Sequence, residues 1–110
     1  MAYNLALEQK MDALSKNWAG LTKKKMFGGI AYMVNGHMVA GPNKEMLVVR
    51  ASPELEAELL TRPYARPMDF TKKPMRGWVF VEPDGWDNDA ILEEILGKAK
   101  AYVDTLPPKF

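Results

Sequence analysis

An Asn-Gly pair at positions 35 and 36 separates two apolar runs, and no other feature of the sequence constrains the fold as strongly. Asn and Gly tolerate positive φ at both central positions of a type I′ turn, which joins the strands of a tight antiparallel hairpin. Residues 26–34 are apolar or small, and residues 37–41 return after the turn. We therefore predict a hairpin of strands 26–34 and 37–41, with the lysines at 23–25 at its entry.

Apolar residues with helical spacing occur near both ends of the chain. Those at positions 3, 7, 11, 14 and 18 line one face of a helix, and Gly20 offers a stop. A second long helix should begin at a cap among residues 87–89 and end before Pro107-Pro108. Its predicted buried residues are Leu92, Ile95, Leu96, Ala99, Val103 and Leu106.

The middle of the chain predicts a third strand followed by a short helix. Residues 46–51, which read MLVVRA, follow a turn-like segment at 42–44 and fit a strand. Ser52-Pro53-Glu54 then has the order of N-cap, first-turn proline and early carboxylate that begins a helix. Three consecutive antiparallel strands thus precede this helix as a meander.

Prolines dominate the next segment and restrict its structure. Those at positions 63, 67 and 74 prevent a continuous helix over residues 61–77, where we expect at most a short strand at 68–70. Residues 78–81 form a clearer strand. The turn tripeptide Pro83-Asp84-Gly85 should end it.

The expected element order is α-β-β-β-α-β-β-α within a single domain, residues 1–110. Antiparallel strands with helices packed against them define an α+β fold with a five-stranded sheet. Apolar residues make up 47% of the chain and cysteine is absent, so an apolar core must hold the fold, as suits a reducing cytoplasm. With no signal sequence and no run of about 20 apolar residues, we expect a cytoplasmic protein without membrane contact.

The sequence lacks the residue combinations of common catalytic sites. The chain contains neither the dinucleotide-binding motif G-x-G-x-x-G nor the P-loop motif G-x-x-x-x-G-K followed by Ser or Thr. We interpret Gly28 and Gly29 as the site of a bulge or of a close approach by another backbone. His37 is the only imidazole, without cysteines or suitably spaced carboxylates, so we predict no metal site, no cofactor and no enzymatic activity. A small-ligand binder or enzyme that uses His37, Arg50 and Asp69 is the alternative.

Charge is unevenly distributed, although 15 basic and 14 acidic residues give a net charge of +1. One basic run lies at 23–25, and the segment 62–76 is strongly positive. If these regions adjoin, they form a basic edge opposite an acidic helix, which would steer charged partners. Methionines and aromatic residues beside the second region suit an adaptable contact patch. The candidate binding residues are Lys23, Lys24, Lys25, Arg62, Arg66, Met68, Phe70, Lys72, Lys73, Arg76 and Trp78.

Two classes of partner are compatible with such a surface. The first is a protein, and an exposed strand edge could recruit either a partner peptide or a second copy of the chain in a homodimer. The alternative is DNA or RNA, whose phosphates would be contacted by the basic groups in a salt-sensitive manner. We favour the protein partner because lysine runs usually serve solubility.

Five segments spread over almost the whole chain carry a family resemblance. They read KKMFGG, VNGHMVAG, ARPMDF, PMRGWVFV and TLPPK. Together they resemble the N-terminal domain of the TfoX (Sxy) family of bacterial competence regulators. The resemblance implies a fold like that of type III secretion chaperones, with helices flanking a five-stranded antiparallel sheet. It also implies a non-enzymatic role in competence gene expression, alongside the cyclic-AMP receptor protein.

Full-length competence regulators of this family carry a second, helical domain at the C-terminus. The present sequence stops at residue 110, shortly after Pro107-Pro108, so we expect a stand-alone copy of the first domain. The competence role does not follow automatically for such copies, and the family offers no catalytic motif to transfer. We expect a regulator of transcription that acts by binding a protein.

Overall fold

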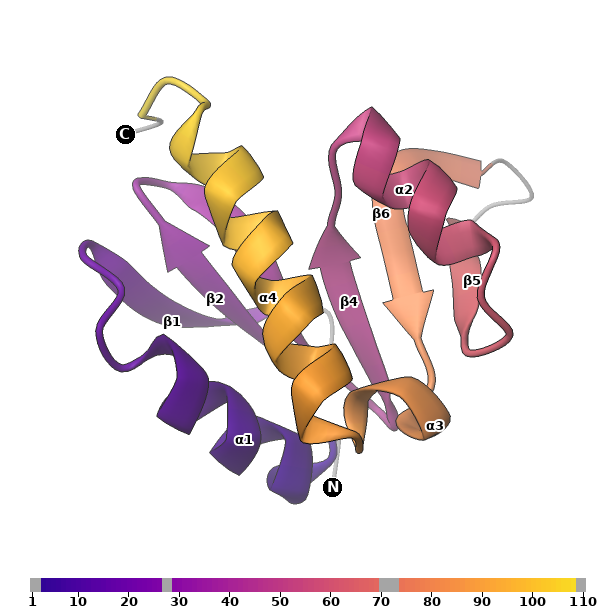
Figure 1. The fold of residues 1–110 in the computed structure, drawn as a ribbon. Coiled ribbons are helices and arrows are strands. Elements are labelled where there is room, and N and C mark those ends of the chain that lie inside the picture. Colours follow the sequence, from indigo (N-terminus) through magenta and orange to yellow (C-terminus); the bar gives the residue numbers. More distant parts are fainter. Residues whose placement is uncertain (1–2, 27–28, 70–73, 109–110) are drawn as a thin grey trace.

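A computed structural model describes residues 3–26, 29–69 and 74–108 of the chain, shown in Figure 1. Over these residues, six strands form one antiparallel sheet in the order β1-β2-β3-β4-β6-β5. The strands are β1 (Leu21–Met26), β2 (Gly29–Val34), β3 (His37–Asn43), β4 (Met46–Arg50), β5 (Ala65–Asp69) and β6 (Pro74–Val81). The helices are α1 (Leu5–Ser15), α2 (Pro53–Leu60), α3 (Pro83–Trp86) and α4 (Asp89–Asp104).

The predicted α+β class is confirmed, but the predicted number of five strands is wrong. The lysine run, expected at the entry of the hairpin, forms an additional strand, β1, which pairs with β2 from Leu21↔Val34 to Met26↔Gly29. β1 is an edge strand, where lysines are tolerated because one side of the strand faces solvent. The strand predicted at 26–34 is therefore divided between the end of β1 and the whole of β2.

The Asn-Gly turn is confirmed, since Asn35 and Gly36 both have positive φ, at 53° and 85°. The turn expected at 42–44 lies slightly later. β3 continues to Asn43, which pairs with Met46, so the reversal falls on Lys44 and Glu45, and Lys44 has a φ of 53°. Gly29 is approached by a neighbouring backbone, as predicted, because an added Cβ would lie 2.1 Å from the Pro42 carbonyl oxygen. Gly28 lies outside the described residues.

The proline-rich segment contains more strand than the sequence indicated. β5 begins at Ala65 rather than at position 68, and β6 begins at Pro74 rather than at position 78. Pro67 is accommodated because β5 is the other edge strand of the sheet, where a missing N–H costs no ladder bond on the outer side. The tripeptide predicted as a turn instead opens α3, with Pro83 in its first turn.

Side-chain caps fix where the longer helices begin. Asn4, Ser52 and Asn88 precede α1, α2 and α4, and each side chain accepts a hydrogen bond from a backbone N–H in the first turn. The predicted stripe of α4 is confirmed for five of its positions, whereas Leu106 lies beyond the helix and is half-buried. Among the described helices, none combines the length and apolarity that crossing a bilayer requires.

All the helices pack on one face of the sheet (Figure 1). The core lies between this face and the helices, and its members come from both layers. Leu7 and Met11 of α1, Leu55 and Leu59 of α2, Trp86 of α3 and the α4 stripe meet strand residues that include Ile30, Tyr32, Val34, Val39, Leu47, Val49, Val79 and Val81. Because side chains alternate along a strand, the intervening residues point to the opposite face.

Candidate functional site

The two predicted basic regions lie at opposite edges of the sheet. β1 carries the lysine run at one edge and β5 lies at the other, with β2, β3, β4 and β6 between them (Figure 1). The two regions therefore do not form the continuous basic edge that would follow if they adjoined. Met68 lies in β5, whereas Phe70, Lys72 and Lys73 lie outside the described residues.

Within the lysine run, Lys23 is engaged with the chain's own acidic residues. Its Nζ lies 2.9 Å from Oε2 of Glu8 and 3.0 Å from Oδ1 of Asp12, and 5.2 Å from the centroid of the Tyr32 ring. Burial opposes the charge on Lys23, but its bonds to the two carboxylates prevail and raise its pKa. Lys23 thus joins β1 to α1, while Lys24 and Lys25 are exposed.

Tyr32 completes this cluster and gives it a measurable dependence on pH. Its hydroxyl donates a hydrogen bond to Oδ1 of Asp12 at 2.6 Å. Burial of the phenol, followed by the bond to Asp12, raises the pKa of Tyr32 well above the ordinary value of 10.0. The folded state therefore favours the neutral phenol, and this contribution to stability is present below about pH 10 and is lost as the pH rises further.

We expect Tyr32→Phe to reduce the alkaline sensitivity of folding. The substitution removes one hydrogen bond, at a cost of about 1 kcal/mol near neutral pH, because Asp12 loses a donor. It also removes the group whose ionisation opposes folding, so the free energy of unfolding should fall less steeply between about pH 9 and about pH 11. Urea unfolding of both proteins across this interval measures the difference. Parallel curves for the two proteins would contradict the assignment.

All three arginines among the predicted binding residues form ion pairs within the chain. Each has a side-chain nitrogen within ion-pair distance of a carboxylate oxygen. The pairs are Arg62 with Glu58, Arg66 with Glu82, and Arg76 with Glu56. Contacts with nucleic-acid phosphates would have to compete with these pairs, so the arrangement gives less support to the nucleic-acid alternative than the sequence does.

The residues of the enzyme alternative do not converge on one site. His37 begins β3, and its Nε2 lies 2.7 Å from the carbonyl oxygen of Pro107, which holds the segment after α4 against the hairpin. Asp69 ends β5, which is separated from β3 by β4 and β6. Within the described part of the chain, no cluster of three His, Cys, Asp or Glu residues could hold a metal ion.

The face of the sheet opposite the helices is apolar at its centre. We call this surface the open face and define it by the strand residues that alternate with the core positions. They are Ala31, Met33, Met38, Met46, Val48, Trp78 and Phe80. Ala31 and Val48 are buried beneath their neighbours, while the three methionines and both aromatic residues are half-buried. No described helix covers this face (Figure 1).

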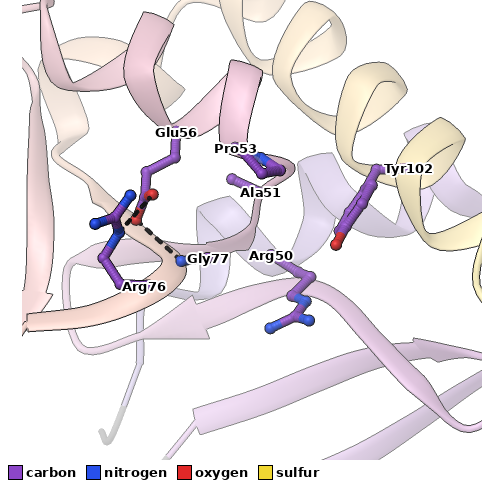
Figure 2. Close-up of a pocket in the computed structure, with 7 residues that line it drawn as sticks. All are labelled: Arg50, Ala51, Pro53, Glu56, Arg76, Gly77 and Tyr102. Atoms are coloured by element: carbon purple, nitrogen blue, oxygen red, sulfur yellow. Dashed lines mark hydrogen bonds and ion pairs between the residues drawn. The ribbon is translucent and has the colours of Figure 1, made fainter.

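A cavity of about 250 Å³ lies at the end of β4, next to the open face. It is lined by Arg50, Ala51, Pro53, Glu56, Arg76, Gly77 and Tyr102 (Figure 2). The Glu56 side chain, largely buried, accepts a hydrogen bond from the Gly77 N–H at 2.9 Å and pairs with Arg76 at 3.3 Å. Arg50 pairs across the ladder with Trp78, so the cavity and the open face share this border.

Comparison with protein families identifies the domain. The family model of the TfoX N-terminal domain matches residues 12–101. The chain belongs to this family. The match begins inside α1 and runs into α4, so it contains the complete sheet and confirms the resemblance seen in the sequence. Among curated proteins, none matches the sequence.

The structure of this TfoX N-terminal domain adds residues to those predicted from the sequence. Trp78 was predicted as a contact residue and lies on the open face, but Met33, Met38 and Phe80 were not predicted. A sequence signal for these three residues can be recognised once the strands are known. Large apolar residues occupy consecutive strand positions and therefore lie on both faces of the sheet. An antiparallel sheet with one solvated face normally alternates apolar with polar residues, and this domain departs from that pattern on β2 and β6.

Proposed function

We propose that this TfoX-family domain is a non-enzymatic protein-interaction module, acting in the cytoplasm in the control of transcription. The partner would be a protein that docks on the open face. The apolar character of that face carries the proposal, because a sheet surface of methionine and aromatic residues resembles the core of a protein interface rather than a solvated surface. The secretion-chaperone-like fold and the competence role implied by the resemblance belong to the same proposal.

The charges around the open face indicate the chemistry of the partner. Lys24 pairs with Ala31 across the ladder and is exposed, and Arg50 occupies the far end of β4. Neither forms an ion pair within the described part of the chain, in contrast to Arg66, which pairs with Glu82. A partner with an apolar centre and peripheral carboxylates would therefore complement this face. Such a surface fits a protein better than the uniform negative charge of nucleic acid.

The test compares two lysine substitutions of apolar residues on opposite sides of the domain. Met38→Lys places a charge on the open face, whereas Leu60→Lys places it on α2, where Leu60 is 39% exposed. Tagged wild-type and variant proteins would be expressed in bacteria, and co-purifying proteins quantified by mass spectrometry. We expect recovery of the partner to fall at least about tenfold with Met38→Lys and to persist with Leu60→Lys, since a charge at the centre of an apolar interface is costly.

The other outcomes identify what would replace the proposal. Equal recovery with both variants would exclude the open face as the docking site. Recovery of only untagged copies of this chain, with a dimer in light scattering, would make the face a homodimer interface instead. Retardation of DNA by the purified domain, decreasing steeply as salt rises, would favour the nucleic-acid alternative. Thermal unfolding of each variant verifies that the fold is retained.

A further inference from the structure

Arg50 differs from every other arginine of the chain. The sequence contains four arginines, and the other three pair with a carboxylate of their own chain. Arg50 has no carboxylate within ion-pair distance among the described residues, although its side chain lies in a partly buried position at the end of β4. Arginine is seldom removed from solvent without an anionic partner, so Arg50 lacks the compensation that is usual for its environment.

Two aromatic rings hold the Arg50 guanidinium in place. Its Cζ lies 5.2 Å from the centroid of the Trp78 ring and 6.0 Å from that of Tyr102. Nη1 lies beside Gly77, where a Cβ would be only 3.3 Å away. Contact with aromatic rings restricts the side chain without using its N–H groups. These donors lie in the plane of the guanidinium and remain free to bind a ligand. Arg50 is therefore preorganised for an anion, and its donors are unused among the described residues.

The cavity beside Arg50 has an excess of one positive charge. Its charged lining residues are Arg50, Arg76 and Glu56, and the latter two form an ion pair with each other. Figure 2 shows this pair on one side of the cavity, and Arg50 with Tyr102 on the other. Glu56 also accepts a hydrogen bond from the Gly77 N–H, so its negative charge is compensated locally. The carboxylate of Glu56 therefore repels an incoming anion only weakly. The uncompensated group is the Arg50 guanidinium.

We propose that this cavity binds a carboxylate carried on a short aliphatic chain, with Arg50 as the binding residue. A planar carboxylate matches the two parallel N–H groups of the guanidinium fork. The volume of about 250 Å³ is below the range of about 300–1,000 Å³ typical of cofactor and drug-sized ligands. Ala51 and Pro53 offer apolar wall to a few methylene groups. The same carboxylate could belong to an acidic side chain of a protein or to a free dicarboxylate.

The experiment follows the Arg50 Nε–H resonance and the Gly77 amide by NMR while glutarate is added to the full chain. Sodium chloride at the same ionic strength provides the reference. We expect saturable shifts of both signals with glutarate and only small, non-saturating shifts with the salt. Binding to Arg50→Gln should be at least about tenfold weaker, because a charge-assisted pair is removed. The matched control is Arg66→Gln, which removes an arginine paired outside the cavity and should bind as the wild type does.

Two acetylated, amidated tripeptides identify the source of the carboxylate. One contains Glu and the other Gln at the central position. Saturable binding of the Glu peptide indicates a protein side chain, whereas binding of glutarate alone indicates a small-molecule ligand. Equal shifts of the two NMR signals with glutarate and with sodium chloride in the wild type would overturn the proposed site. This result does not depend on whether any variant folds. Undiminished binding by Arg50→Gln would also overturn it. Because the NMR titration contains no protein partner, a negative result in it would not affect the interpretation of the Met38→Lys comparison.

Discussion

Gly41→Ala is expected to destabilise the domain by at least about 3 kcal/mol, a large fraction of the free energy of unfolding of a domain of this size. An added Cβ would lie 1.8 Å from the carbonyl oxygen of Ile30 and 2.9 Å from its carbonyl carbon. Both atoms belong to the backbone of β2, so no side-chain rotation relieves the clash. β2 and β3 would have to separate near the middle of the sheet. Urea unfolding followed by circular dichroism measures the loss.

The matched control is Gly97→Ala, the same chemical change on α4. Gly97 is exposed, and apart from its chain neighbours and the nearby backbone of α4 no described atom lies within 4 Å of an added Cβ there. Alanine has a higher helix propensity than glycine, so this variant should be more stable than the wild type by up to about 1 kcal/mol. The two variants should thus change stability in opposite directions. A Gly41→Ala protein with wild-type stability would show that the two strands are less closely apposed than the structure indicates.

Local signals predicted those parts of the fold that depend on neighbouring residues. The turn at Asn35-Gly36, the Ser52 cap and the buried stripe of α4 each follow from interactions within a few positions along the chain. Such interactions are encoded by residue type and spacing. The structure confirms all three. The same logic placed a turn at Pro83-Asp84-Gly85 but could not show that this turn is the beginning of α3.

Long-range pairing explains what the sequence could not predict. β1 has three consecutive lysines and no alternation of apolar residues, and it becomes a strand because β2 offers a backbone ladder along its whole length. β6 pairs with β4 and β5, and this order brings Trp78 beside Arg50 although the two residues are 28 positions apart in the sequence. Neither the open face nor the Arg50 cavity can be located in the sequence without knowledge of that pairing. The candidate site was therefore predictable only in part, through Trp78 and Arg76 as contact residues and through Arg50 in the ligand-binding alternative.

Trp86 shows how a short local signal can conceal a core residue. It follows the Pro-Asp-Gly tripeptide, so the sequence places it after a surface turn, yet in the structure it is 3% exposed and joins the core beneath α4. Its Nε1 donates a hydrogen bond to the carbonyl oxygen of Glu45 at 2.8 Å. α3 thus anchors the β3–β4 turn to the entry of the last helix. The indole satisfies both the apolar and the polar requirement of that position.

We expect Trp86→Ala to destabilise the domain by about 3–5 kcal/mol, because it leaves a cavity and removes the donor for the Glu45 carbonyl. Trp86→Phe should cost less, since it retains an aromatic ring while losing the hydrogen bond. The matched control is Trp18→Ala, at a half-buried position on the margin of the core, which should cost less than Trp86→Ala. Urea unfolding of the three variants measures these differences. If Trp86→Ala and Trp18→Ala cost the same, Trp86 would not be the anchor of α3, and the helix would be held by the chain on either side of it.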